Sequence, residues 1–221
     1  MVWWHIVLVV VLSYLFGNIS VARFVAKSQH SDVTKLGSGN PGTTNILRNF
    51  GFYLGLLNLV LDILKGFLPA FISFKIFGDN YTYLYIAGLS TMVGHVYPVV
   101  FGFKGGKGIA SMLGVFFAAD PLVALIVVLI AAISWLCFEY GSVASFLCVT
   151  ALTVYEGIRM KNILPNSESR IICVLLYAIF LLTWFAHRGN IQRLLVGREN
   201  KVSLTKSTKK KIKQQRKIEQ V

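Results

Sequence analysis

The sequence is poor in charged residues and in cysteine. Only 14% of its 221 residues are charged, against about a quarter in an ordinary soluble domain, while 55% are hydrophobic. Its three cysteines, Cys137, Cys148 and Cys173, lie in expected helices without CxxC spacing or paired histidines. The cysteine pattern argues against a disulfide framework or a zinc site, and the composition indicates a protein embedded in a bilayer. No metal or cofactor is expected.

The hydrophobic runs predict an all-α, polytopic membrane protein with about seven transmembrane helices. A full crossing takes roughly 20 mainly apolar residues. Six runs approach or exceed this length, at residues 3–24, 51–77, 81–101, 121–138, 143–159 and 171–186. The run at 108–119 is too short for a comfortable crossing, so we expect a half or tilted span there. The first run lacks the cationic start of a signal peptide and counts as a span.

Positive charge predicts the orientation, because Lys and Arg concentrate on the cytoplasmic side of membrane proteins. Here they gather after the first and third runs and in the segment 188–217. Seven crossings with the N-terminus outside place all three regions, and the C-terminus, in the cytoplasm. The exception is the sixth connection, with Arg159, Lys161 and Arg170, which this topology sends outside. If the number of spans were wrong by one at this connection, the C-terminal tail would lie on the opposite side of the membrane.

Residues 1–201 are expected to form a single integral-membrane domain, followed by a basic cytoplasmic tail at 202–221. The lysine-dense run 206–217 cannot bury an apolar face, so we expect it to be disordered or loosely helical. The positive-inside bias favours a topology anchor, and binding to anionic membrane lipids is the alternative. Nucleic acid is not expected as a partner.

The first of three polar clusters between the hydrophobic runs is rich in glycine, which lets backbone amides converge on an anion. The cluster also carries side-chain donors and one guanidinium. Its candidate phosphate-binding residues are Ser38, Gly39, Asn40, Thr44, Asn45 and Arg48. Pro41 favours a helix start, which places Thr44 and Arg48 on one helix face. The alternative is a hydrated glycine-rich turn without a ligand.

The second cluster is a glycine turn that carries two ammonium groups. It differs from a nucleotide P-loop, because Phe101 replaces the first glycine and Gly108 replaces the magnesium-binding Ser or Thr. ATP is therefore not the expected ligand. The turn keeps four residues that suit a second phosphate, Lys104, Gly105, Gly106 and Lys107. His95, upstream, is either a base or a hydrogen-bonding residue inside the bundle.

The third cluster supplies the best-placed candidate for a general base, His187. Asn190 follows three residues later, so the two side chains share a face if the last helix continues past Ala186. Asn190 would orient a hydroxyl, and Glu199 stands among arginines as a structural partner. Within the second span, Asp62 and Lys65 form either an internal ion pair or part of a substrate site, because isolated charges there are costly.

Together these clusters resemble the three motifs of the PlsY family, bacterial integral-membrane glycerol-3-phosphate acyltransferases that use acyl-phosphate as donor. The resemblance extends to about Lys201, and its first two motifs match in order. The third motif departs at Ala186, where the family usually has arginine, and at Gly189, where it usually has glutamate.

The resemblance implies an enzyme of the bacterial cytoplasmic membrane with a cytoplasm-facing site. Its reaction would join a fatty acyl group to the 1-hydroxyl of glycerol 3-phosphate, giving lysophosphatidic acid and phosphate for phospholipid biosynthesis. By analogy, phosphate groups are held by Ser38, Arg48, Lys104 and Lys107, the glycerol is addressed by His187 and Asn190, and the site is supported by Glu199. Ser142 also matches a family serine.

An acyl-phosphate carries a good leaving group, so positioning and cationic stabilisation suffice without a covalent nucleophile. The absence of a GxSxG motif agrees with this. The proton acceptor is either His187 or a substrate phosphate. Two alternatives stay open. One is a membrane carrier for organic phosphates, which the charged pair Asp62 and Lys65 within a span would favour. The other is the same acyl transfer from acyl-CoA or acyl-carrier protein.

Overall fold

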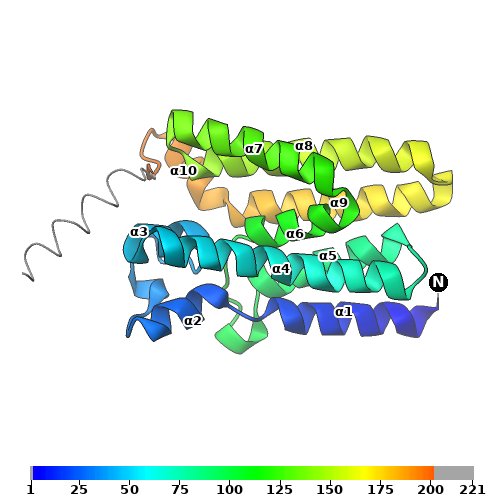
Figure 1. The fold of residues 1–221 in the computed structure, drawn as a ribbon, viewed down its shortest axis with the longest axis horizontal. Helices are drawn as coiled ribbons and strands as arrows, with labels where there is room; N and C mark the ends of the chain where they lie inside the picture. Colours follow the sequence, from blue (N-terminus) through cyan, green and yellow to red (C-terminus); the bar gives the residue numbers. More distant parts are fainter. Residues whose placement is uncertain (1, 202–221) are drawn as a thin grey trace, which may run out of the picture.

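The computed structural model describes residues 2–201, and this part of the chain contains helices and no strands (Figure 1). The longer helices are α1 (Trp3–Gly17), α4 (Phe52–Ile76), α5 (Tyr81–Val96), α7 (Pro121–Phe138), α8 (Gly141–Ile163) and α9 (Asn166–Ala186). The shorter ones are α2 (Val21–Ser28), α3 (Thr43–Phe50), α6 (Ile109–Ala119), α10 (Arg188–Leu195) and the 3-10 turns η1 (Val33–Lys35) and η2 (Val99–Phe101). The predicted tail at 202–221 lies outside the described residues.

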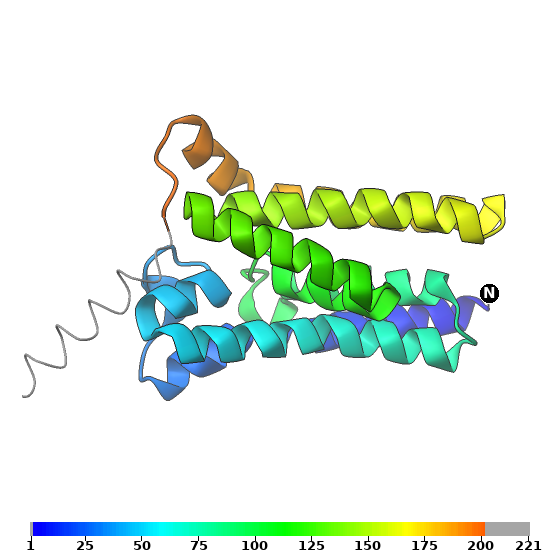
Figure 2. The same ribbon diagram turned by 45° about the horizontal axis from the view of Figure 1, so that its top comes forward.

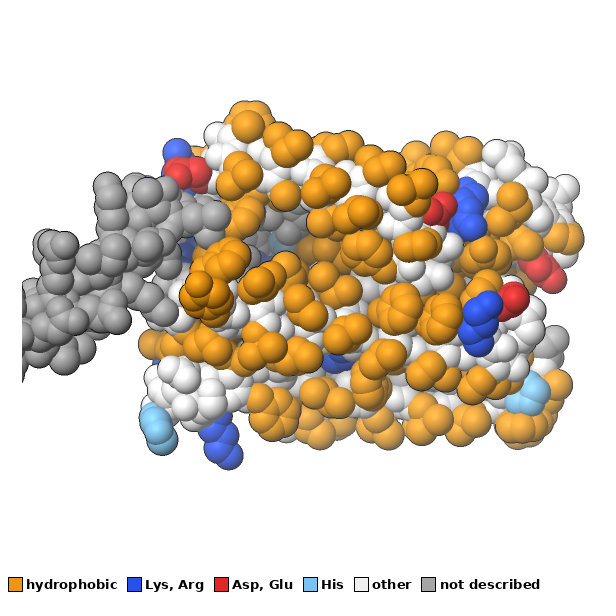
Figure 3. Space-filling model, viewed as in Figure 1, with side chains coloured by type: hydrophobic (Ala, Val, Ile, Leu, Met, Phe, Trp, Pro, Cys, Tyr) orange, Lys and Arg blue, Asp and Glu red, His pale blue; other side chains and the backbone are white. Residues whose placement is uncertain are grey.

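Six segments in the described part of the chain are long and apolar enough to cross a membrane. They are Trp3–Ser28, Phe52–Ile76, Tyr81–Phe101, Pro121–Phe138, Gly141–Ile163 and Asn166–Ala186. The helix α6 has 11 residues and rises about 16 Å, roughly half of a hydrocarbon core, as predicted for a short span. Hydrophobic side chains cover the middle of the face in Figure 3, and charged ones lie towards its ends. The chain is a multi-pass integral membrane protein.

The first predicted span is divided into two helices. The helix α1 ends at Gly17 and α2 begins at Val21. The buried Asn18 side chain donates to the Tyr14 carbonyl (2.6 Å), and Lys65 Nζ donates to the Ile19 carbonyl (2.7 Å). Side chains thus bond the backbone at the break, an arrangement that competes with helical hydrogen bonds. The break turns α2 towards the first polar cluster.

Small residues let the central helices approach each other closely. A Cβ atom at Gly66 of α4 would lie 1.8 Å from the Ser111 carbonyl oxygen of α6, and one at Gly114 would lie 2.0 Å from the Ile63 carbonyl oxygen. Close backbone contact is the usual way in which membrane helices gain packing energy, since lipid offers no hydrophobic drive. The short α6 is therefore fixed against α4.

All three polar clusters lie near one end of the bundle. Figures 1 and 2 show α2, α3 and α10 at the end opposite to the N-terminus, although these helices are far apart in the sequence. The sequence predicted that the clusters share one side of the membrane, and this arrangement is consistent with that prediction.

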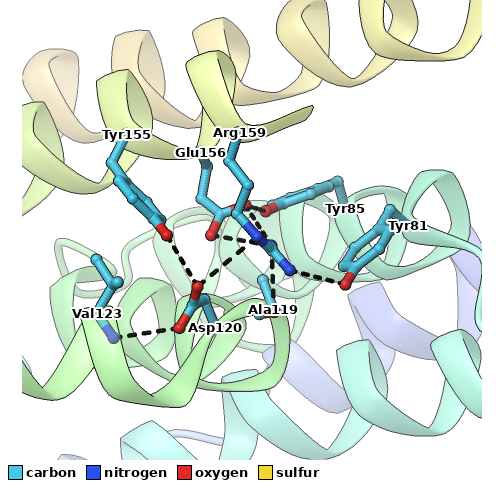
Figure 4. A network of polar contacts seen from close by, with 8 residues as sticks. All are labelled: Tyr81, Tyr85, Ala119, Asp120, Val123, Tyr155, Glu156 and Arg159. Atoms are coloured by element: carbon cyan, nitrogen blue, oxygen red, sulfur yellow. Dashed lines mark hydrogen bonds and ion pairs between the residues drawn. The ribbon is translucent and has the colours of Figure 1, made fainter. Parts of the chain in front are cut away.

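A polar network lies towards the other end and links α8 with α5 and with the turn before α7 (Figure 4). Glu156 is 1% exposed and accepts hydrogen bonds from the Tyr85 hydroxyl (2.8 Å) and from Arg159 (3.1 Å). Arg159 also donates to the Tyr81 hydroxyl (2.9 Å) and lies 3.7 Å from Asp120. Arg159, one of the three cations that depart from the predicted charge bias, is thus paired within the bundle.

Candidate active site

A polar cavity of about 200 Å³ joins the three clusters. Ten of the residues predicted for the site lie in its wall: Ser38, Asn40, Thr44, Arg48, Asp62, Lys107, Ser142, His187, Asn190 and Glu199. They come from the loop before α3, from α3 and α4, from the turn before α6, and from the segments that begin α8 and follow α9. The folded chain therefore gathers residues that are up to 161 positions apart, from Ser38 to Glu199.

The first cluster is organised around the buried side chain of Asn45. This side chain accepts a hydrogen bond from the Ser38 amide (3.2 Å) and donates to the carbonyls of Leu36 (2.9 Å) and Val33 (3.2 Å). Asn45 therefore shapes the loop from behind, and it does not line the cavity. The helix α3 begins beside the cavity after Gly42, without a side-chain cap. Its first amides suit an anion in the cavity.

The second cluster folds back on the end of α5. The amide of Gly105 donates to the Val96 carbonyl (3.1 Å), and the amide of Gly106 donates to the His95 carbonyl (3.1 Å). This fold places Lys107 in the cavity wall, where its ammonium group donates to Asn190 Oδ1. Gly106 itself does not line the cavity.

Arg23 of α2 supports this turn and was not predicted as a site residue. Its guanidinium donates to the Lys104 carbonyl (2.8 Å) and lies 4.5 Å from the centre of the Phe101 ring. The sequence showed it only as one of the positive charges that set the topology. Because its partners are 78 and 81 positions away, no local pattern identifies the contact.

A second hollow of about 560 Å³ adjoins the cavity. It contains three of the six remaining predicted residues, Gly39, Lys104 and Gly105, and it shares Ser38, Asn40, Lys107, Asn190 and Arg193 with the cavity. Arg23 and Arg188 add cations to its wall. Two adjoining spaces lined by fixed positive charge can hold two anionic groups.

The environment of the cavity lowers the pKa of two of its cationic side chains. Burial lowers the pKa of Lys107 to about 8; Arg193 and Arg48 contribute to this shift, and Glu199 partly opposes it. Burial also lowers the pKa of Arg48, again against the attraction of Glu199. A site whose cations are partly dehydrated and repel each other favours a bound dianion, which would relieve both effects.

His187 lies at the junction between α9, which ends at Ala186, and α10, which begins at Arg188. Its Nδ1 donates to the Thr183 carbonyl (2.9 Å), because a carbonyl oxygen accepts only. The lone pair of Nε2 is therefore available in the neutral ring. Burial, followed by the charge of Lys107, lowers the pKa of His187 to about 4. The imidazole is thus neutral near pH 7.

Glu199 connects the third cluster to the rest of the site. One carboxylate oxygen accepts from Asn190 (2.6 Å) and Ser142 (3.1 Å), and the other accepts from Arg193 Nε (2.9 Å). The side chain is 5% exposed, so these bonds are well shielded from water. The Asn190 side chain thus accepts a hydrogen bond from Lys107 at Oδ1 and donates one to Glu199 from Nδ2. Within residues 2–201, no three His, Cys, Asp or Glu side chains gather as a metal site.

An apolar groove of about 260 Å³ continues from the cavity between α4, α6, α7 and α8. Leu56, Leu113, Val128 and Trp135 lie in its wall, and Thr43, Thr44, Leu59, Ile109, Gly141 and Ser145 belong to both spaces. Figure 3 shows a hollow between α4 and α7 in this region. The site therefore combines a cationic chamber with an apolar channel.

This combination defines an integral membrane protein with a cationic cavity that opens into an apolar groove. The family model described as glycerol-3-phosphate acyltransferase matches residues 7–197. A protein named glycerol-3-phosphate acyltransferase from Aquifex aeolicus is 41% identical over 194 residues, covering 87% of this chain and 96% of that protein. The namesake from Endomicrobium trichonymphae is 37% identical, covering 90% and 97%. The chain belongs to this family, known as PlsY, and is an acyltransferase.

Solved structures support the same assignment. The crystal structure of PlsY (YgiH), an integral membrane glycerol 3-phosphate acyltransferase, in its glycerol 3-phosphate form has a TM-score of 0.82 and 38% identity. The match covers 91% of this chain and 97% of that one. The lysophosphatidic acid form has a TM-score of 0.80 and 37% identity, covering 92% and 98%.

Proposed function

We propose that this enzyme transfers a fatty acyl group from acyl-phosphate to the 1-hydroxyl of glycerol 3-phosphate and releases lysophosphatidic acid and inorganic phosphate. The observation that carries the proposal is the continuity of the cationic cavity with the apolar groove. One space suits two phosphate groups and the other suits a single acyl chain. The related structures with glycerol 3-phosphate and with lysophosphatidic acid support the acceptor and the product.

The acceptor oxygen attacks the acyl carbonyl carbon, and the bond from that carbon to the phosphate oxygen breaks. Arg48 and Lys107 stabilise the departing phosphate, because both are fixed cations in the cavity wall. Ser38 and the first amides of α3 hold a non-bridging oxygen of that phosphate. No covalent enzyme intermediate is required, because phosphate is already a good leaving group.

The proton of the attacking hydroxyl ends on phosphate. A phosphate monoester has a second pKa of about 6, above the value of about 4 for His187, so the phosphate is the stronger base. His187 Nε2 then accepts the hydroxyl hydrogen bond and orients the oxygen, and Asn190 fixes the glycerol beside Lys107. His187 thus acts as a hydrogen-bond acceptor, and the phosphate acts as the general base.

The reaction is placed at the cytoplasmic face of a bacterial inner membrane, with the N-terminus outside and the C-terminus inside. The positive-inside bias of the sequence supports this orientation, as does the position of all three clusters near one end of the bundle. A cytoplasmic site gives direct access to a water-soluble acceptor, while the acyl donor enters from the lipid.

The donor is tested with purified protein in detergent and labelled glycerol 3-phosphate. Palmitoyl phosphate is expected to give labelled lysophosphatidic acid without CoA, whereas palmitoyl-CoA and palmitoyl-carrier protein are expected to give none. Product from either thioester alone would contradict the acyl-phosphate assignment. Uptake of the label into vesicles without product would favour the carrier.

A further inference from the structure

A buried chain of polar side chains on α4 joins the first and second clusters, and both its Asp62 and the neighbouring His95 lie in the cavity wall. Asn58, Asp62 and Lys65 are 0%, 2% and 4% exposed. Asn58 Nδ2 donates to Thr43 Oγ1 at the start of α3 (2.9 Å) and to Asp62 Oδ2 (2.9 Å). Asp62 Oδ1 lies 3.0 Å from Lys65 Nζ. The sequence left open whether Asp62 and Lys65 form an internal pair or serve the substrate.

The ammonium group of Lys65 has three neighbours that match its three protons. They are Asp62 Oδ1 (3.0 Å), the Ile19 carbonyl (2.7 Å) and His95 Nδ1 (2.7 Å). An ammonium group only donates, so Nδ1 of His95 must accept. The neutral ring consequently carries its proton on Nε2, the opposite tautomer to that of His187.

His95 presents its Nε2 edge to the second cluster. A Cβ atom at Gly106 would lie 2.2 Å from His95 Nε2 and 3.0 Å from the Pro41 carbonyl oxygen. The ring, the glycine turn and the loop before α3 thus meet at one point. The backbone carbonyl of His95 also receives the Gly106 amide (3.1 Å). Lys107, which lines the cavity, is the next residue after this contact.

We propose that Asp62 and Lys65 are positioning residues that fix the tautomer and the orientation of His95, which in turn sets the 105–107 turn and the reach of Lys107 into the cavity. The inference rests on the proposed function for its kinetic consequence. It assigns the buried pair on α4 a role in substrate binding that acts through His95.

If Asp62 and Lys65 served stability alone, their neutral replacement would leave the substrate kinetics unchanged. Replacing both partners of a buried ion pair by neutral groups is often neutral for stability, whereas removing one partner strands a charge. The double variant Asp62→Asn/Lys65→Met removes both charges and the donor to His95. Asp62→Asn/Lys65→Gln removes both charges but keeps an amide donor for Nδ1. The matched control is Lys75→Met/Asp79→Asn, an exposed pair on and just after the same helix.

The kinetic test compares these variants with the parent protein in detergent. We expect the Met double variant to remain folded and to raise KM for one phosphorylated substrate by about tenfold or more, with a smaller change in kcat. The Gln double variant should recover most of this loss, and the control should match the parent. Parental KM values in a folded Met double variant would overturn the proposal.

The tautomer test does not depend on activity. In protein labelled with ¹⁵N-histidine, with the His95→Gln variant used for assignment, we expect the His95 signals of a protonated Nε2 and a hydrogen-bonded, unprotonated Nδ1. The Met double variant should lose this single state. A proton on Nδ1 of His95 in the parent protein would overturn the inference, even if the donor of the acyl group proved to be different.

Discussion

At the scale of single residues, Lys107 determines how the site responds to pH. Its pKa of about 8 is lowered from the ordinary value of 10.5, so the cation is lost from the free enzyme as the pH rises through about 8. The profile of kcat/KM reports groups of the free enzyme. We therefore expect kcat/KM for glycerol 3-phosphate to fall above about pH 8.

Lys107→Arg checks this assignment, because a guanidinium stays charged at every accessible pH. The pH above which kcat/KM falls should be higher in this variant, even if the absolute value of kcat/KM is lower. Lys161→Arg, in an exposed position of α8, is the matched control and should leave the limb in place. A limb that is unchanged in the Lys107 variant would remove Lys107 from the origin of the pH dependence.

Gly106 tests the close contact between the second cluster and His95. A Cβ atom there would collide with His95 Nε2 at 2.2 Å, so Gly106→Ala must displace the turn or the ring. We expect kcat/KM to fall by about tenfold to a hundredfold, the usual effect of a displacement near 1 Å in a site. Gly157→Ala, where no atom lies within 4 Å, should retain parental kinetics in the same assay.

The sequence predicted residue types better than residue positions. Clustered glycines and polar residues predicted Arg48, Lys107 and His187 for the site, because phosphate chemistry restricts which residue types serve it, and the fold brings these three into one cavity wall. The internal role of Asn45 depends on carbonyls at Val33 and Leu36, which are 12 and 9 positions away. Arg23 depends on a contact across 81 positions. Such partners follow from the fold and not from local patterns.

At the scale of helices, the network around Glu156 and Arg159 holds α8 to the rest of the bundle. Replacing Arg159 by Met strands the carboxylate of Glu156, which is 1% exposed. We expect Arg159→Met to lower the free energy of unfolding by about 3 kcal/mol or more. The measurement is unfolding in mixed micelles of rising denaturing-detergent content.

Two further variants separate charge burial from other effects. The double variant Glu156→Gln/Arg159→Met has no stranded charge and should recover most of the lost stability. Arg170→Met removes an exposed guanidinium that donates only to the nearby Asn166 carbonyl, and it should unfold like the parent. Equal loss in the single and double Arg159 variants would show that the ion pair is not the cause.

The long apolar segments were predictable, whereas the short helices α2 and α10 and the helix ends were less so. Hydrophobic length identified the six long segments and the short α6, because the bilayer sets the length of a span. The helices α8 and α9 extend beyond the predicted 143–159 and 171–186, since polar residues such as Lys161 and Glu168 continue them outside the hydrophobic run. At the break after Gly17, the Ile19 carbonyl accepts from Lys65, a contact across 46 positions that no local pattern reveals.

At the scale of the whole molecule, the three clusters must lie on one side of the membrane. In a background without native cysteines, Lys35→Cys and Arg198→Cys should react with an impermeant thiol reagent only from the cytoplasmic side. Asp79→Cys and Lys161→Cys should react only from the opposite side. All four positions are exposed in the structure. Labelling of Lys35→Cys and Arg198→Cys from opposite sides would separate the clusters and contradict a common site.

The most direct measurement of the central claim is the balance of products formed in this cavity. Purified protein is mixed with palmitoyl phosphate and glycerol 3-phosphate in the absence of CoA, and lysophosphatidic acid and inorganic phosphate are quantified together. The account predicts equal amounts of the two products, and a loss of both in folded Arg48→Ala. Phosphate release without lysophosphatidic acid, or parental product formation by Arg48→Ala, would contradict it.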